Sequence, residues 1–172
     1  MNKPIAIVAG EPNSISSEII FKVWKLKKQF KHRPFFIIGS ISLLNLQKKK
    51  INFRIKIKEI PMNFKIKDLK GSELPVYNIN YNQRKTFEKI TSNSNNYIFK
   101  CIDTAYKFAE NKKIGGFINC PVSKESLFKK KHQGVTEYLS NKTGLKNKGV
   151  MLIYNKDMSV CPITSHIPIS QI

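Results

Sequence analysis

Two short, unbroken apolar runs near the amino terminus constrain the fold more than any other feature of this sequence. They are PIAIVAG at residues 4–10 and PFFIIGS at residues 34–40. Neither run alternates apolar and polar residues as a half-exposed strand does, and both are too short to span a membrane. Continuous runs of this length are typical of strands buried on both faces, as in parallel sheets. We therefore expect two buried strands.

The segments that follow these runs have helical patterns. Apolar residues recur on one face over residues 18–30, with Ser16 or Ser17 as the expected cap, and residues 42–50 continue as a short helix. The order strand, helix, strand, helix predicts an α/β fold with a mainly parallel sheet flanked by helices.

The remainder of the chain predicts further elements of both kinds. We expect a half-exposed strand at 53–60, a second strand at 75–79 and a polar loop over 80–96. A helix over 97–111, capped by Asn93 or Ser94, precedes a strand–turn–helix unit at 115–127. A short helix then ends at Gly144, two strands form a hairpin that turns at 155–157, and HIPISQI starts a new helix.

The charge balance is strongly basic, with 31 Lys and Arg residues against 11 Asp and Glu residues. Only three of the basic residues are arginine, the type that base-edge readout and bidentate phosphate contacts favour. The lysines run from Lys3 to Lys156 alongside many Ile and Asn residues, which share A/T-rich codons. We interpret this as a solvated lysine surface and do not expect a nucleic-acid partner, although a polyanion-binding surface remains the alternative.

The cysteines and the amino terminus bear on the compartment. Cys101, Cys120 and Cys161 are odd in number, far apart and set in apolar runs, which predicts buried free thiols in a reducing compartment. The first apolar run leads into Gly-Glu-Pro and makes a poor signal peptide. No segment is apolar over enough residues for a transmembrane helix. We expect a cytoplasmic protein without a membrane partner.

Two stretches offer candidate ligand-binding residues at the ends of strands. AGEPNSISSE follows the first strand, where doubly wound folds bind ligands, and supplies Glu11. Its single glycine does not make a GxGxxG phosphate loop, and an ordinary strand-to-helix turn is the alternative. NCPVSKESL places Lys124 near a helix start, where a lysine meets phosphate or carboxylate groups, or is simply one more surface lysine.

Two further stretches lie in the last third of the chain. QGVTEYL supplies Thr136, either as a helix cap or as a hydroxyl that holds a phosphate. ITSHIPI supplies His166, a candidate metal ligand at a strand end. A metal ion needs several ligands, and no second one is close in the sequence, so a structural histidine is the alternative.

In their order and spacing, the four stretches resemble the amino-terminal half of the 4-hydroxythreonine-4-phosphate dehydrogenase family of vitamin B6 synthesis. GEPNSISSE matches G-[DE]-P-A-G-I-G-P-E, and CPVSK matches a G-P-[VI]-x-K turn. GVTEYL matches G-H-T-E-[FY]-[LF], and TSHIPI matches T-x-H-[IL]-P-L. The chain departs from these motifs at Val135, where the family has a substrate-contacting histidine, and at Ser14, Ser16 and Cys120, which replace glycines.

The resemblance implies a fold and an activity. Residues 1–172 would be the amino-terminal part of a homodimeric enzyme with two α/β subdomains, similar to the isocitrate and isopropylmalate dehydrogenases, with the carboxyl-terminal part absent. Such enzymes use NAD to oxidise a small phosphorylated amino acid, 4-phosphooxy-threonine, and the product loses carbon dioxide. A divalent metal (zinc, magnesium or manganese) held by three histidines polarises the reacting oxygen.

The resemblance also assigns roles to residues of this chain. His166 would be a metal ligand, and Thr136, Lys124 and Glu11 would bind substrate. The other metal histidines and most of the NAD site lie in the half that the chain does not match, so no cofactor-binding residue is expected here and the fragment alone is expected to be inactive. A non-catalytic basic binding or dimerisation module is the alternative.

Overall fold

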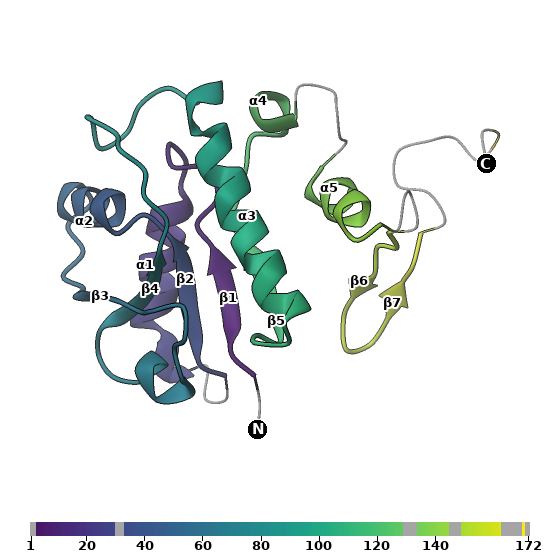
Figure 1. Cartoon of the computed structure of the whole chain (residues 1–172), viewed down its shortest axis with the longest axis horizontal. Helices are drawn as coiled ribbons and strands as arrows, with labels where there is room; N and C mark the ends of the chain where they lie inside the picture. Colours follow the sequence, from purple (N-terminus) through teal and green to yellow (C-terminus); the bar gives the residue numbers. More distant parts are fainter. Residues whose placement is uncertain (1–2, 30–32, 129–133, 145–148, 163–169, 171–172) are drawn as a thin grey trace. The chain divides into compact units, whose positions relative to one another are not determined.

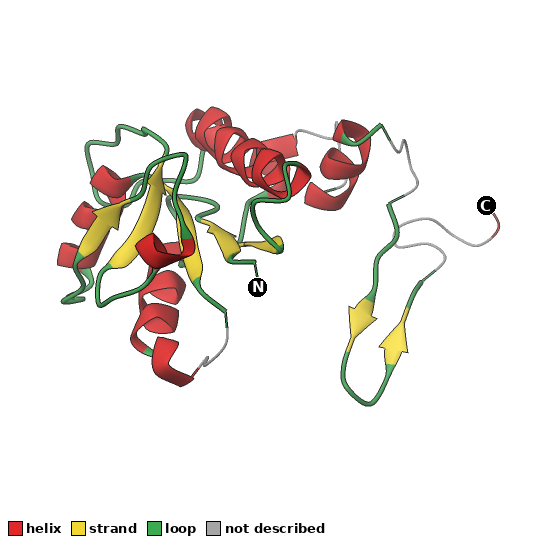
Figure 2. Cartoon of the chain, turned by 60° about the horizontal axis from the view of Figure 1, so that its bottom comes forward, coloured by secondary structure: helices red, strands yellow, loops and turns green. Residues whose placement is uncertain are grey.

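The computed structural model describes residues 3–29, 33–128, 134–144, 149–162 and 170. The chain divides into two compact units, Met1–Leu127 and Phe128–Ile172, and each is described by itself. The first unit holds a five-stranded sheet with helices on both faces (Figures 1 and 2). The second unit holds a short helix and a two-stranded ribbon.

All strand pairs of the five-stranded sheet are parallel, which confirms the α/β class. The strand order is β3-β4-β2-β1-β5. The strands are β1 (Ile5–Val8), β2 (Phe35–Gly39), β3 (Ile57–Glu59), β4 (Leu74–Asn78) and β5 (Gly116–Asn119). The two apolar runs of the sequence become β1 and β2, which are buried as predicted. Each is paired with a strand on both sides. The basic, alternating segment shortens to the edge strand β3.

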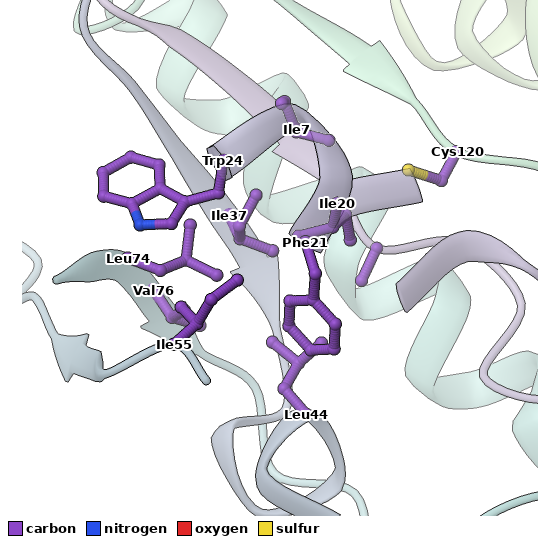
Figure 3. Packing of buried hydrophobic residues seen from close by; sticks show 11 residues of the cluster. Ile7, Ile20, Phe21, Trp24, Ile37, Leu44, Ile55, Leu74, Val76 and Cys120 are labelled. Carbon is purple, nitrogen blue, oxygen red and sulfur yellow. The ribbon is translucent and has the colours of Figure 1, made fainter. Parts of the chain in front are cut away.

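One face of the sheet packs against α1 (Ser16–Lys25) and α2 (Ile41–Lys50). Figure 3 shows the apolar side chains of this layer, including Phe21 and Trp24 of α1 with Ile37 of β2. The phenylalanine Phe21 and the isoleucine Ile37 have no exposed surface. Burying side chains of this size contributes about 1.5–3 kcal/mol each, so this layer is a substantial source of stability for the first unit.

The opposite face packs against α3 (Asn95–Glu110), the long helix in Figure 1. The ring of Phe108 lies 6.2 Å from that of Phe36 in β2, centroid to centroid. Ile98, Cys101, Ile102 and Ala105 of the same helix have no exposed surface, which confirms the inward face predicted from the sequence. Tyr106 is the exception, because it is only half-buried and its hydroxyl bonds to Glu110 at 2.7 Å.

The helix starts differ from the sequence predictions. Helix α1 has Ile15 at its N-cap, and neither Ser16 nor Ser17 caps it, because both lie inside its first turn. The hydroxyl of Ser16 pairs instead with that of Ser14, 2.7 Å away. Ser94 does occupy the N-cap of α3 as predicted, but its hydroxyl makes no capping bond. Helix α1 also ends earlier than predicted, at Lys25 instead of residue 30, and a 3-10 helix follows at Lys27–Gln29.

The second unit contains α5 (Val135–Lys142) and the antiparallel strands β6 (Ile153–Tyr154) and β7 (Ser159–Val160). The predicted hairpin turn is confirmed, because the Asn155 amide donates to the Met158 carbonyl at 2.9 Å. Gly144 follows α5 with φ +75°, as expected of a helix-ending glycine. Cys161 is exposed, so the prediction of three buried thiols is wrong there. The predicted helix after His166 lies outside the described residues.

Helix α4 (Lys124–Phe128) is a short turn of helix at the boundary of the two units. No helix within the described ranges has both the length and the apolar character needed to cross a bilayer.

Candidate functional site

From β1 the chain passes to β2 on one side of β1, and it later returns to β5 on the other side. The carboxyl ends of the neighbouring strands β1 and β5 therefore form a topological switch point. Val8 at the end of β1 is in register with Asn119 at the end of β5. In open α/β sheets, ligands bind in the crevice outside the carboxyl ends of strands at such a point. The loops that carry Glu11 and Lys124 both begin here, although the sequence separates them widely.

The two loops touch through their backbones. The Glu11 amide donates to the Pro121 carbonyl at 2.9 Å. Gly10 has φ +68°, and a Cβ built on it would lie 2.6 Å from the Pro121 oxygen and 2.8 Å from the Cys120 oxygen. A glycine is therefore required at position 10, because a side chain would both strain the backbone and displace two carbonyl groups.

The carboxylate of Glu11 is buried, with 1% of the residue exposed. It accepts hydrogen bonds from the Ser94 hydroxyl at 3.1 Å and from the Asn13 amide at 3.1 Å. Both donors are neutral, and Ser94 is the N-cap of α3, where the helix dipole favours a negative charge. These donors offset part of the desolvation of the carboxylate. Glu11 thereby fastens the β1–α1 loop to the start of α3.

Residues 80–91, which we call the strap, are hydrogen-bonded to the same loop. The Asn13 side-chain oxygen accepts from the Gln83 side-chain amide and from the Glu88 backbone amide, both at 2.8 Å. The Gln47 side chain in α2 donates to the Pro12 carbonyl at 2.7 Å and to the Thr86 carbonyl at 3.3 Å. Sequence reasoning missed Asn13 and Gln47. The one available signal was a glutamine on the otherwise apolar buried face of α2.

Tyr81 of the strap stacks against Tyr97 of α3, with ring centroids 4.7 Å apart. Burial raises the pKa of Tyr81, and the charges of Glu11 and Glu88 raise it further. Burial also raises the pKa of Tyr97 well above its usual value, and its hydroxyl accepts the Ser40 amide at 3.0 Å. Both phenols therefore stay protonated at neutral pH and act as hydrogen-bonding groups, not as bases.

Several buried polar atoms at this edge have no protein hydrogen-bond partner. Ser17, which is 4% exposed, lines a small pocket with Glu11 and Gln47 and leaves its hydroxyl oxygen unpaired. The pocket has room for about one water molecule. The side-chain oxygens of Asn95, Asn119 and Ser126 are likewise unpaired. Buried polar atoms need partners, so this edge is prepared for water or for polar groups of a ligand.

The other predicted site residues are spread over the two units. Lys124 is exposed at the start of α4, in the first unit. Thr136 is exposed in the first turn of α5, whose N-cap is Gly134, so its expected role as a cap is wrong: the helix begins one residue before it. Val135 is half-buried beside it. His166 lies outside the described residues.

The described residues do not by themselves form a metal or dinucleotide site. Nowhere within them do three His, Cys, Asp or Glu side chains gather to hold a metal ion. The β1–α1 loop places Ser14 and Ser16 where a glycine-rich loop would bring its backbone against a pyrophosphate. Burial raises the pKa of Cys101 to about 12 and that of Cys120 to about 11, which leaves both thiols protonated and poor ligands.

The fold and this edge define an α/β domain of the type that binds small ligands at a topological switch point. Solved structures narrow the fold to the isocitrate dehydrogenase-like class. The 4-hydroxythreonine-4-phosphate dehydrogenase from Burkholderia phymatum superposes with a TM-score of 0.83 at 19% identity, over 99% of this chain and 52% of that one. The enzyme of that name from Klebsiella pneumoniae gives 0.79 at 22% identity, over 99% and 53%.

The sequence comparisons identify the family. The family model of the pyridoxal phosphate biosynthetic protein PdxA matches residues 31–172, and the chain belongs to this family. The 4-hydroxythreonine-4-phosphate dehydrogenase of Zymomonas mobilis is 26% identical over 169 residues, which are 96% of this chain and 49% of that protein. That of Sulfurihydrogenibium is 29% identical, over 98% and 51%. The chain spans about half the length of these relatives and matches their amino-terminal half.

Proposed function

We propose that this chain is the amino-terminal half of an NAD-dependent dehydrogenase that oxidises 4-phosphooxy-threonine in pyridoxal phosphate synthesis, with loss of carbon dioxide from the product. The family match over residues 31–172 carries this proposal. It is supported by the contact between the first two motif loops, which the structure joins at the Glu11–Pro121 hydrogen bond. That contact lies where α/β enzymes bind substrate.

In this proposal the residues of the chain bind and position an anionic substrate. In the first unit, the exposed ammonium of Lys124 attracts a phosphate or carboxylate group. In the second unit, the exposed hydroxyl of Thr136 is a hydrogen-bond donor, and the resemblance to the family assigns it to substrate binding. Glu11 was predicted to contact substrate directly. Because its carboxylate already accepts from Ser94 and Asn13, we propose that it positions the β1–α1 loop, which leads into the first turn of α1, where Ser17 lines the pocket with its hydroxyl unpaired.

The divalent metal (zinc, magnesium or manganese) and NAD enter this proposal through the family alone. His166 is the metal ligand that this half would contribute. The second half of the relatives would supply its partners and the NAD site, since the described residues of this chain form neither.

We further propose a homodimer in the cytoplasm. The β6–β7 hairpin exposes large apolar side chains, with 58% of Ile153, 73% of Tyr154 and 68% of Met158 accessible. An isolated two-stranded ribbon is marginally stable in water, and its outer edges offer unpaired backbone groups. A second copy of the hairpin would cover this surface by a two-fold, self-complementary contact.

The decisive experiment sequences the source DNA beyond the codon for Ile172. The encoded product is then assayed with 4-phosphooxy-threonine by following NADH absorbance. We expect substrate-dependent NADH formation from a product that contains both halves, and its loss in the variant His166→Ala. The matched control His32→Ala should keep activity, because His32 belongs to no motif. A stop codon directly after Ile172 in intact genomic DNA would end the dehydrogenase proposal for this chain.

The 172-residue chain gives an independent test. Purified alone with zinc, magnesium or manganese, it should form no NADH on 4-phosphooxy-threonine. Turnover by this chain that disappears in His166→Ala would refute the division of the site between two halves.

A further inference from the structure

Four lysines gather at the edge of the sheet where the strands begin, opposite the candidate site. We call Lys27, Lys28, Lys58 and Lys70 the lysine patch. The Lys27 amine donates to the Gly71 carbonyl, and the Lys58 amine donates to the Lys70 carbonyl at 3.2 Å. These segments are the 3-10 helix that follows α1, the edge strand β3 and the residues before β4, so the fold brings together lysines that are distant in the sequence.

The charges of this patch repel one another. Burial lowers the pKa of Lys27, and the nearby charges of Lys28 and Lys58 lower it further. A surface that serves solubility intersperses charges of both signs, because like charges in proximity oppose folding. The ion pair found within the described ranges joins Lys22 to Glu18, so it does not neutralise the patch. A folded surface that keeps this repulsion between its lysines is suited to a partner that brings negative charge.

Two of the four amines, those of Lys27 and Lys58, are held by hydrogen bonds to backbone carbonyls before any partner arrives. The Lys27 amine also lies 3.6 Å from the centre of the Trp24 ring, and the Trp24 indole donates to the Ser72 carbonyl at 3.3 Å. The backbone carbonyls of Lys70 and Gly71, just before β4, thus hold the side chains of Lys58 in β3 and Lys27 in the 3-10 helix. Side chains that are already ordered lose less conformational entropy when they bind.

We propose that the lysine patch binds the phosphodiester backbone of a nucleic acid without reading its bases. Lysine acts as a point charge toward phosphate, whereas base readout favours arginine, and the patch contains no arginine. An anionic membrane is the less suitable partner, because bilayer binding combines charge with apolar insertion. Beside the patch, Leu26 is the large apolar side chain available for insertion, and it is 44% exposed.

The test measures binding of a fluorescent, mixed-sequence single-stranded oligonucleotide to the 172-residue chain by anisotropy, over a salt series. Four phosphate contacts predict a slope of about −2.8 in log K against log salt, or about 50-fold weaker binding between 50 and 200 mM salt. The patch variant carries Lys28→Gln, Lys58→Gln and Lys70→Gln. Lys27 is unchanged, because its amine is bonded to the Gly71 carbonyl. Its slope should shrink by about 2.

A control variant removes the same charge elsewhere in the first unit. It carries Lys85→Gln, Lys100→Gln and Lys107→Gln, all at exposed positions. The proposal expects the control to bind within about threefold of the unchanged chain with the same slope, and circular dichroism to show both variants folded. A second oligonucleotide of different sequence should bind equally well, since phosphate contacts carry no sequence information.

Three results would overturn the proposal. One is equal weakening in the patch and control variants, which would mean diffuse lysine adhesion. Another is the absence of oligonucleotide binding at 50 mM salt. The third is patch-dependent binding to phosphatidylserine vesicles with none to the oligonucleotides, which would identify a membrane surface instead. Each result leaves the dehydrogenase proposal untouched, because none of these lysines belongs to its site.

Discussion

Replacing Gly10 by alanine tests the contact between the two motif loops most directly. Gly10 has φ +68°, a conformation that costs an L-residue about 1–2 kcal/mol. The new Cβ would also lie 2.6 Å from the Pro121 oxygen and 2.8 Å from the Cys120 oxygen, closer than real Cβ atoms approach other heavy atoms. Both neighbours are backbone atoms and cannot rotate away, so the loops must separate.

The separation adds a second cost. The Pro121 oxygen accepts the Glu11 amide at 2.9 Å, and losing that hydrogen bond costs about 1 kcal/mol. Strain and lost bonding together predict that Gly10→Ala lowers the free energy of unfolding by about 2–4 kcal/mol. Since native domains are stable by about 5–15 kcal/mol, a loss of this size is readily measured.

Urea unfolding followed by tryptophan fluorescence is a suitable assay, because Trp24 is the one tryptophan of the chain and is buried in the first unit. Gly71→Ala is the matched control: Gly71 also has positive φ, +111°, but a Cβ there would meet nothing within 4 Å. It should show the strain alone. A loss of no more than about 1–2 kcal/mol for Gly10→Ala, which the backbone conformation alone costs, would refute the argument from the loop contact.

Four other predictions concern separate features of the chain. Ser94→Ala should destabilise the first unit by about 1–3 kcal/mol in the same urea assay, because it leaves the buried Glu11 carboxylate short of a donor. Alkylation at pH 8 with mass spectrometry should label Cys161 and spare Cys101 and Cys120 while the fold is intact. The stability should fall as pH rises from about 9 to 11, since burial raises the pKa of Cys120 to about 11 and the unfolded chain alone releases that proton; Cys120→Ala should flatten this slope. Ile153→Lys should lower the dimer fraction in sedimentation experiments, and an unchanged dimer would exclude the hairpin as its contact.

The central strands were predictable because burial on both faces leaves a continuous apolar run. The pattern of α3 was equally informative, since Ile98, Cys101 and Ile102 recur at helical spacing and all lie inside. These features depend on residues that are close in the sequence.

The helix caps were less predictable because a serine hydroxyl has several partners within reach. Ser16 bonds to Ser14, and Ser94 bonds to Glu11, which is distant in the sequence. By contrast Ser40, which no pattern singled out, caps α2 by accepting the Leu43 amide at 3.3 Å. Propensity identifies residues able to cap, but the tertiary structure decides which of them do so.

The same reasoning applies to Glu11, the candidate whose interpretation changed most. A carboxylate after the first strand suggests a group that faces substrate, and the sequence alone offers no reason to bury it. The structure supplies that reason in two neutral donors, the nearby Asn13 amide and the hydroxyl of Ser94 at the start of α3, which is distant from Glu11 in the sequence. A residue can thus support a loop without facing a ligand, by holding the loop that leads into the first turn of α1, where Ser17 lines the pocket. On this argument Glu11 determines whether the contact between the β1–α1 loop and the start of α3 is formed.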